Sequence, residues 1–561
     1  MNIKLTSGLL IALPLLASTS CSKKLGQFSS DNFTVNPNPL ELVGEKVPAT
    51  ITANIPPKFF VKNASVTVTP YLVFDGREEA SQSYSFQGQD VRGNSPVVYY
   101  ERGGTVTIPV NYKWNPSMIK SELELAFNVT QGSKQYVLPR VKVATGVIAT
   151  ADLASAGNVT PALAPDKFQR IIKEKYAADI KFLVNQANIR DGELKKGDIV
   201  RLQKNMVEAS QAPNREIEEI NVSSYASPEG GIDLNTRLAQ NREKNTTDYL
   251  NKELKRNNIS FGELTAQFTP EDWDGFQRLV SESNIQDKEL ILSVLSMYKD
   301  PEQREREIRN LSSIFDQLAE DILPQLRYSR ITATVNTIGK SDEEIQRVFN
   351  QNPNSLTIDE LLYCATLTDD NNEKMKIYRK AAAIYPDDYR PYNDLGLTQY
   401  VAGDYNSAKT SFAQAARINP SAPEPQMNMG LIALMNGDYA AADQKFGAAA
   451  GVEELDEALG TSYLLQGDNA AAVRAFGNAR SNNAALAQIL TKDYAKAKST
   501  LGSIYNPDAT TYYLTAVLGA RLKNDAMVQN NLKQAVKLDS SLAKRAKEDM
   551  EFAGYNLSSI L

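Results

Sequence analysis

Apolar and polar residues alternate in short runs between residues 28 and 148. From Val106 to Tyr112 every second residue is apolar, and the pair Gly103-Gly104 precedes this run. Further runs of this kind contain Val66 and Val68; Leu123, Leu125, Phe127 and Val129; and Val137, Val141 and Val143. A period of two between turn residues is typical of half-buried antiparallel strands. We predict an all-β immunoglobulin-like sandwich over residues 28–148, acting as a spacer or docking module.

The pattern changes twice in the next 190 residues. Residues 149–165 are small, carry little charge and end in two prolines, which predicts an interdomain linker. Residues 166–340 then mix strand-like and helical stretches, so we expect an α+β domain there. Within it, residues 270–326 are acidic and amphipathic and are predicted to be a helical insertion.

The C-terminal third of the chain repeats itself. Six residues, which we call the mark residues, are separated by 34, 34, 30, 25 and 31 positions: Asp370, Asp404, Asp438, Asp468, Asp493 and Asn524. Eight positions after each mark stands a large residue: Tyr378, Phe412, Phe446, Phe476, Leu501 and Leu532. Eleven positions after it stands a residue that is usually small: Ala381, Ala415, Ala449, Ala479, Ile504 and Ala535. Such a period predicts an all-α solenoid of about six helix pairs over residues 355–561.

This repeat resembles the tetratricopeptide repeat (TPR). The best unit carries Gly396, Ala408, Phe412, Ala415 and Pro420 at the positions of that pattern. Small residues let the two helices approach, the aromatic residue fills the gap to the next unit, and proline ends the second helix. The marks lie closest around residues 480–492, where we expect shortened connections or first helices.

The resemblance implies that protein partners bind the concave surface, which in this family typically accepts an extended peptide or a helix. Helix-face reasoning places five candidates there: Asn393, Gln399, Tyr400, Asn428 and Tyr463. For each of them, a solvated polar face is the alternative interpretation. The partners we expect are outer-membrane or envelope-assembly proteins.

The N-terminus combines Lys4 with a short apolar run from Leu9 to Ala17, which is typical of a secretory signal. The small residues of Ser18-Thr19-Ser20 before Cys21 resemble a bacterial lipobox, although leucine is more usual at the first of these positions. The resemblance implies a signal peptide over residues 1–20, lipidation of Cys21, and a tether over 21–27. We expect a lipoprotein of the outer membrane that faces the periplasm. A plain cleaved signal is the alternative.

Residues 220–250 resemble the core of the OmpA-like domain, in the subgroup that carries Tyr-Ala-Ser-Pro-Glu-Gly. The matching residues are Tyr225, Gly230, Asn235, Leu238, Arg242, Tyr249 and Leu250. In members that bind peptidoglycan, the resemblance implies an Asp that accepts the ammonium of the stem peptide and an Arg that binds its carboxylate. Arg242 is kept, Ser227 stands at the Asp position, and Glu229 lies two residues on. Either Arg242 and Asn235 bind the cell wall weakly, or they structure the turn between strand and helix.

Composition narrows the chemistry. Histidine is absent from the 561 residues, which excludes Ser-His and Cys-His catalysis and His-ligated metals. A net charge of −6 without a basic stripe argues against nucleic-acid binding. The carboxylates around Trp273 lack the EF-hand spacing and suit a helix N-terminus. If Cys21 is acylated, Cys364 is the only remaining thiol, so no intramolecular disulfide can form.

We therefore expect a non-catalytic scaffold with no cofactor, no metal and no catalytic residues. It would be anchored by lipid and would recruit proteins through its repeats. Two alternatives stay open, a peptidoglycan tether and a carboxylate-dependent cell-wall enzyme.

Overall fold

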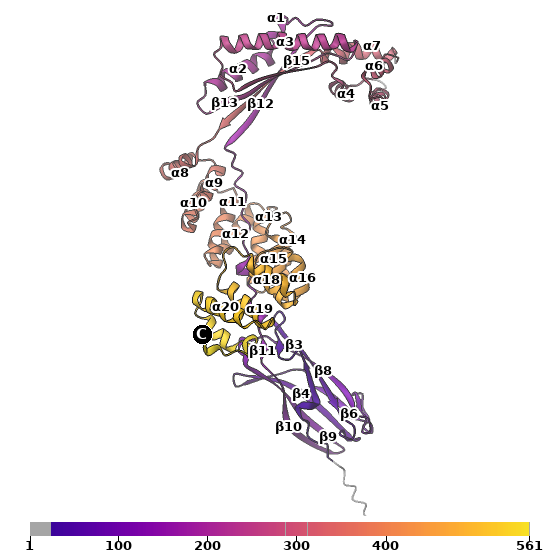
Figure 1. Cartoon of the computed structure of the whole chain (residues 1–561), viewed down its shortest axis with the longest axis vertical. Coiled ribbons are helices and arrows are strands. Elements are labelled where there is room, and N and C mark those ends of the chain that lie inside the picture. Colours follow the sequence, from indigo (N-terminus) through magenta and orange to yellow (C-terminus); the bar gives the residue numbers. More distant parts are fainter. Residues whose placement is uncertain (1–23, 286–287, 311, 560–561) are drawn as a thin grey trace, which may run out of the picture. The chain divides into compact units, whose positions relative to one another are not determined.

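A computed structural model describes residues 24–285, 288–310 and 312–559, and places them in two compact units (Figure 1). The first unit joins Met1–Pro165 to Asp369–Leu561, and the second is Asp166–Thr368. The chain is β-rich at its N-terminal end, mixed α/β in the middle and all-α at the C-terminal end, as the sequence predicts. None of the helices in the described ranges has both the length and the apolar character needed to cross a membrane.

Two sheets form the N-terminal part of the first unit. The smaller sheet has the order β1-β3-β8, with β1 (Phe33–Asn36), β3 (Lys46–Ile55) and β8 (Gly104–Lys113). The larger has the order β10-β9-β4-β6-β7, with β5 paired to β4; its strands are β4 (Ala64–Phe74), β5 (Arg77–Ala80), β6 (Tyr84–Gly88), β7 (Val97–Val98), β9 (Ser121–Gln131) and β10 (Lys134–Thr145). A short parallel pair joins β2 (Leu40–Glu41) to β11 (Val147–Ile148).

The alternating pattern buries one face of these strands. Every second residue of β4 is buried, and β8 alternates in the same way. The buried side chains of both sheets form one apolar core, in which the Phe28 and Phe127 rings stack 4.8 Å apart. The immunoglobulin-like type of this arrangement stays a prediction.

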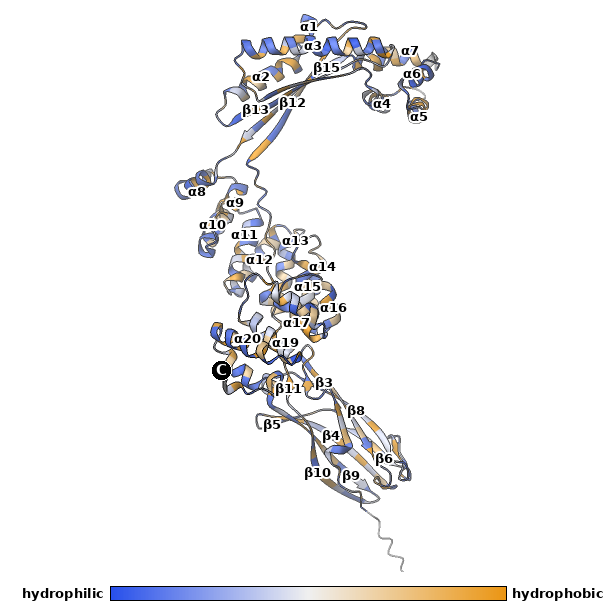
Figure 2. Ribbon diagram, in the orientation of Figure 1, coloured by the Kyte–Doolittle hydropathy of each residue, from blue (hydrophilic) through white to orange (hydrophobic). Residues whose placement is uncertain are grey.

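A four-stranded sheet with the order β12-β15-β13-β14 organises the second unit. Its strands are β12 (Ile171–Lys181), β13 (Arg215–Tyr225), β14 (Glu263–Thr269) and β15 (Tyr328–Ile338). Strands β13 and β14 run parallel, and the other pairs are antiparallel. Helices α2 (Gly197–Gln211) and α3 (Ile232–Arg256) cover one face, where their buried residues share a core with the sheet. Figure 2 colours most of α3 hydrophilic, as expected for a helix with one buried side.

Residues between β14 and β15 form a small helical subdomain with its own apolar core. It contains α4 (Trp273–Glu282), α5 (Lys288–Met297), α6 (Pro301–Asn310) and α7 (Ser312–Gln317), then a π turn over Leu318–Ile322 and a 3-10 turn over Leu323–Leu326. The predicted insertion over residues 270–326 covers this subdomain. The second unit ends with α8 (Asp342–Gln351) and α9 (Ile358–Thr366), so its boundary lies past residue 355, where we expected the repeats to begin.

The C-terminal part of the first unit is an array of antiparallel helices. In order they are α10 (Asn371–Ile384), α11 (Arg390–Val401), α12 (Tyr405–Ile418), α13 (Pro423–Met435), α14 (Tyr439–Gly447), α15 (Leu455–Gln466), α16 (Asn469–Phe476), α17 (Asn482–Leu490), α18 (Tyr494–Gly502), α19 (Ala509–Arg521), α20 (Asp525–Leu538) and α21 (Leu542–Glu548). α17 and α18 have only nine residues each, in the region where the marks crowd together.

All six mark residues are helix N-caps. Each side chain accepts a hydrogen bond from a backbone N–H in the first turn of α10, α12, α14, α16, α18 or α20. The large residues eight positions later are all buried. The period in the sequence is therefore the period of capped second helices, each with a buried apolar residue at the same place.

Close approach of paired helices explains the recurring glycines. A β-carbon on Gly396 would lie 2.6 Å from the Phe412 ring, and one on Gly430 would lie 2.5 Å from the Phe446 ring. Both distances are well inside van der Waals contact, so only glycine fits. This matches the predicted role of small residues in the repeat.

The sheets and the array share one compact unit because they touch at several places. Gly44 packs against the backbone of Gln466, and Gly146 packs against the Met550 side chain. Lys120 forms an ion pair with Glu548 at 3.0 Å. The N-terminal sheets and the repeats are thus one body, although about 200 residues separate them in sequence.

Candidate functional site

Residues 149–165, which we call the bound segment, lie against the repeat helices. Two 3-10 turns, Thr150–Leu153 and Ala156–Asn158, interrupt an otherwise extended course. The segment connects the sandwich to the second unit, as predicted for a linker, but it is packed against protein. Its Ala156, Val159 and Ala162 belong to the core of α11 to α15. We call the helix surface that receives it the repeat groove.

The middle of the segment is held at Ala162. The Asn428 side chain accepts from Ala162 N at 2.7 Å, and the same amide donates to Ala162 O at 2.9 Å. Asn393 donates to that carbonyl too, at 2.9 Å. The main chain of this one residue thus bonds to two buried asparagines, both of which are 0% exposed. An unpaired buried amide is costly, so this contact is strongly specified.

Similar contacts hold the rest of the segment. Asn483 accepts from Ser155 N at 3.2 Å and donates to Ser155 O at 2.8 Å. Tyr400 donates its hydroxyl hydrogen to Ala156 O at 2.7 Å. Towards the C-terminal end, Asp394 accepts from Ala164 N at 2.9 Å and Arg390 donates to Pro165 O at 3.3 Å.

At least eight hydrogen bonds therefore run between the groove and residues 155–165, and all eight go to the main chain of the segment. The buried side chains of this stretch are small: Ala156, Val159, Pro161, Ala162 and Ala164. Larger neighbours such as Leu163, 48% exposed, point away from the groove. The groove recognises an extended backbone and leaves room only for small side chains.

The N-terminal end of the segment is tied by side chains. Thr150 donates to Glu551, which also forms an ion pair with Arg521 at 2.7 Å. Asp152 accepts from Trp114 Nε1 at 3.2 Å and forms an ion pair with Arg545 at 3.4 Å. This end joins the sandwich, the segment and the last helices of the array.

Asp394 is the one carboxylate buried under the segment among these contacts, and it is 1% exposed. Its Oδ1 also accepts from Asn393 Nδ2 at 3.1 Å. Burial raises its pKa to about 8, against the lowering effect of the hydrogen bonds from Ala164 and Asn393. The protonated acid is therefore favoured in the folded chain near neutral pH.

The predicted concave-face residues divide into two groups. Asn393, Tyr400 and Asn428 all bind the segment. Gln399 accepts from the Ser411 hydroxyl at 2.7 Å within the array, and Tyr463 is 38% exposed.

Sequence reasoning missed Asp394 and Asn483. A signal was present: Asp394, Asn428 and Asn483 each stand ten positions before a mark residue. Aligning the units on the marks would have revealed this polar ladder.

The second unit contains the residues predicted to bind peptidoglycan. Arg242, on α3, is 1% exposed. Its guanidinium donates to the carbonyls of Tyr225 at 2.8 Å, Gln186 at 3.0 Å and Leu183 at 3.3 Å. Burial, and then the nearby charge of Arg327, lower its pKa to about 10. Arg242 thus fixes the end of β13 to the loop after β12.

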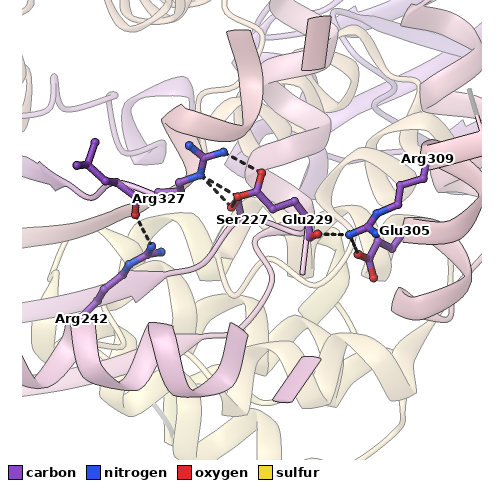
Figure 3. Close-up of polar contacts among 7 residues, drawn as sticks. Ser227, Glu229, Arg242, Glu305, Arg309 and Arg327 are labelled. Atoms are coloured by element: carbon purple, nitrogen blue, oxygen red, sulfur yellow. Dashed lines mark hydrogen bonds and ion pairs between the residues drawn. The ribbon is translucent and has the colours of Figure 1, made fainter. Parts of the chain in front are cut away.

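Glu229 is engaged from two sides (Figure 3). Arg327 binds its carboxylate through two nitrogens at 3.0 and 2.8 Å, and Ser227 donates to it at 3.0 Å. Arg309, itself paired with Glu305 at 2.5 Å, donates to the Glu229 carbonyl. Asn235 donates to the Gly230 carbonyl at 2.6 Å. The anion and cation that a zwitterion would need are here already bound to protein.

The carboxylates beside Trp273 in the helical subdomain make structural contacts. Asp272 caps α4 by accepting from Gly275 N, and Glu271 accepts from Trp273 Nε1. Within the described parts of the chain, no group of three or more potential ligands is placed to hold a metal ion. Cys21 lies outside the described residues, so its lipidation stays a prediction.

No protein-family model matches the sequence, and no curated protein matches it either. Solved structures resemble the repeat region. A tetratricopeptide repeat protein from Parabacteroides merdae is 14% identical, with 37% of this chain and 91% of that chain covered and a TM-score of 0.30. PilF from Pseudomonas aeruginosa is 16% identical, with 38% and 99% covered and a TM-score of 0.28. YrrB, described as a TPR protein with an unusual peptide-binding site, is 18% identical, with 37% and 100% covered and a TM-score of 0.20. Scores this low say nothing of function, and the repeat character follows from the capped helix pairs.

Proposed function

We propose that this protein is a non-catalytic scaffold that binds other proteins through its repeat array. The observation that supports this most is the bound segment, because the array already holds an extended polypeptide by its main chain. A surface that pairs buried asparagines with peptide groups is suited to binding peptides. Protein recognition is also the general use of helical repeat arrays.

The cellular setting of the proposal comes from the sequence. The signal-like segment and Cys21 support a lipid anchor at the outer membrane, with the folded units in the periplasm. A protein held there could gather outer-membrane or envelope-assembly proteins. Substituting Cys21→Ser should release the protein from the membrane fraction, and unchanged fractionation would remove the anchor from the proposal.

The peptidoglycan tether is a weaker candidate. Arg242 donates to three backbone carbonyls and Glu229 is paired with Arg327, so both of these charges are already engaged within the protein. We expect the full chain to stay in the supernatant when purified sacculi are sedimented. Cosedimentation that is lost in Glu229→Gln and kept in the exposed control Asp248→Asn would support the tether instead.

Site-specific photo-crosslinking in cells tests the scaffold. A photoreactive residue is placed on the array at Tyr463, which is 38% exposed, or on the sandwich at Val137, which is 73% exposed. We expect defined envelope proteins, identified by mass spectrometry, to crosslink from the array position and not from the sandwich position. Adducts at neither position, or the same adducts at both, would contradict recruitment by the repeats.

A further inference from the structure

The repeat groove binds a ligand that is part of the same chain. The groove forms its hydrogen bonds with the main chain of residues 155–165, and the inward side chains of this stretch are alanine, valine and proline. Any extended peptide without proline at the positions of Ser155, Ala162 and Ala164 has the same N–H and C=O groups in the same order. Side-chain size at the inward positions is therefore the main selection that the groove applies.

We infer that the bound segment is a displaceable strap, and that the groove beneath it accepts an extended partner peptide with small inward side chains. This inference rests on the proposed function, because it names the site and the class of partner of the scaffold. The occupant is an alanine-, serine- or glycine-rich extended stretch of another protein. In a peptide with leucine or an aromatic residue facing inward, that side chain would clash with the helices that Ala156 and Ala162 now contact.

Three features distinguish the strap from ordinary core. It has no regular helix or strand beyond two short turns. It buries no side chain larger than valine between residues 155 and 165. The polar residues beneath it, Asn393, Asn428 and Asn483, can bond water or another backbone equally well once it leaves. The array helices, in contrast, are held to each other by large buried side chains such as Phe412 and Phe446.

The strap competes with any partner peptide for the repeat groove. It belongs to the same chain, and Asp152 and Thr150 fix its N-terminal end, so it is present at high effective concentration and excludes weak peptides. A partner must either bind more tightly or present its peptide while already held nearby on the array. Binding would then free a length of chain between the sandwich and the second unit.

The test uses the full-length protein and a fluorescein-labelled, acetylated synthetic peptide with the sequence of residues 152–166. Ala162→Arg should dislodge the strap, because Ala162 is 1% exposed, whereas Leu163→Arg should not, because Leu163 is 48% exposed and faces outward. We expect Ala162→Arg to bind the peptide at least tenfold more tightly than the wild type, and Leu163→Arg to match the wild type. Adding Asn428→Ala to Ala162→Arg should lower the affinity at least tenfold. A peptide with leucine at positions 156 and 162 should not bind.

Hydrogen exchange of the unmodified protein keeps the inference testable even if Ala162→Arg does not fold. The amides of Ala162 and Ala164 donate to groove side chains, whereas the Leu431 amide lies inside α13. A strap that opens by itself makes the first two exchange at least tenfold faster than the third. Equal rates, or a folded Ala162→Arg protein that ignores the peptide, would overturn the strap.

The outcomes also separate the two proposals. Peptide binding to Ala162→Arg without any cellular crosslinks from the array would leave the strap standing and remove the scaffold. Crosslinks from Tyr463 with no peptide binding and no independent opening would keep the scaffold and remove the strap.

Discussion

Asp394 makes the stability of the first unit depend on pH, and Asp394→Asn should remove that dependence. The folded chain favours the protonated carboxyl, with a pKa of about 8, and an exposed aspartate in the unfolded chain titrates near 3.8. Between these values folding takes up a proton. The free energy of unfolding therefore falls as the pH rises from about 4 to about 8. Below this window both states are protonated, and above it both are ionised, so the effect is constant at each end.

The size of the effect follows from the window. Each pH unit inside it costs about 1.4 kcal/mol, so the wild type should lose about 4 kcal/mol between pH 5 and pH 8 through this group. Asparagine keeps an oxygen that can accept from Ala164 N and carries no charge. The difference in unfolding free energy between Asp394→Asn and the wild type should thus grow in favour of the variant by about 4 kcal/mol over that range.

Tryptophan fluorescence can follow the first unit alone. The chain has two tryptophans, Trp114 in the first unit and Trp273 in the second, so Trp273→Phe leaves a single reporter beside the bound segment. Urea unfolding at pH 5, 6, 7 and 8 then gives the free energies. Asp404→Asn is the matched control: hydrogen bonds from Ser407 lower the pKa of Asp404, so its own window lies below about pH 4 and its difference from the wild type should stay flat from pH 5 to 8. Parallel curves for Asp394→Asn and the wild type would refute the reasoning.

Three other substitutions test the packing, each by urea unfolding with the tryptophan of the relevant unit. Gly430→Ala should lower the free energy of unfolding by about 1–3 kcal/mol, because its methyl group would lie 2.5 Å from Phe446. Gly447→Ala, with open space around it, should cause no loss of stability. Equal effects would contradict the close approach of the paired helices. Lys492 has φ 65°, and Gly403 and Gly437 occupy the same place in other units. Lys492→Gly should therefore raise the free energy of unfolding by about 0.5–1 kcal/mol, whereas Lys533→Gly, at an exposed position within α20, should lower it by about 1 kcal/mol. A loss of stability for both would show that the left-handed turn is not strained. Arg327→Ala should destabilise the second unit by about 2 kcal/mol, because it leaves the half-buried Glu229 without its partner. Adding Glu229→Gln should restore most of the lost stability. No recovery would mean that Arg327 acts through packing.

The period of the repeats could be predicted because particular side chains recur at fixed positions in each unit. Aspartate caps and buried aromatics recur at fixed offsets, and Asp404 with Phe412 shows both. The alternating runs of the sandwich work in the same way, since burial of one face leaves an apolar residue at every second position. In both cases the type of residue at a position indicates whether that position is buried, exposed or a helix cap.

The role of residues 149–165 could not be predicted for the opposite reason. Its contacts use peptide groups, which every residue has, and its buried side chains are alanines that suit a linker equally well. The second unit shows a different limit. The resemblance singled out Arg242, but its surroundings are three backbone carbonyls and the charge of Arg327, about 85 residues away, which no local pattern reveals.

The first unit is discontinuous in sequence, and this fixes the order in which its parts can be assembled. The helices that must receive Pro165 begin about 200 residues after it, so the segment emerges before its binding site both during synthesis and during export. The middle unit can fold in that interval, while the strap waits exposed. Glu551, ten residues from the C-terminus, completes the anchor of Thr150. A chain that lacks these helices therefore keeps an unpaired, extended segment that proteases readily cleave.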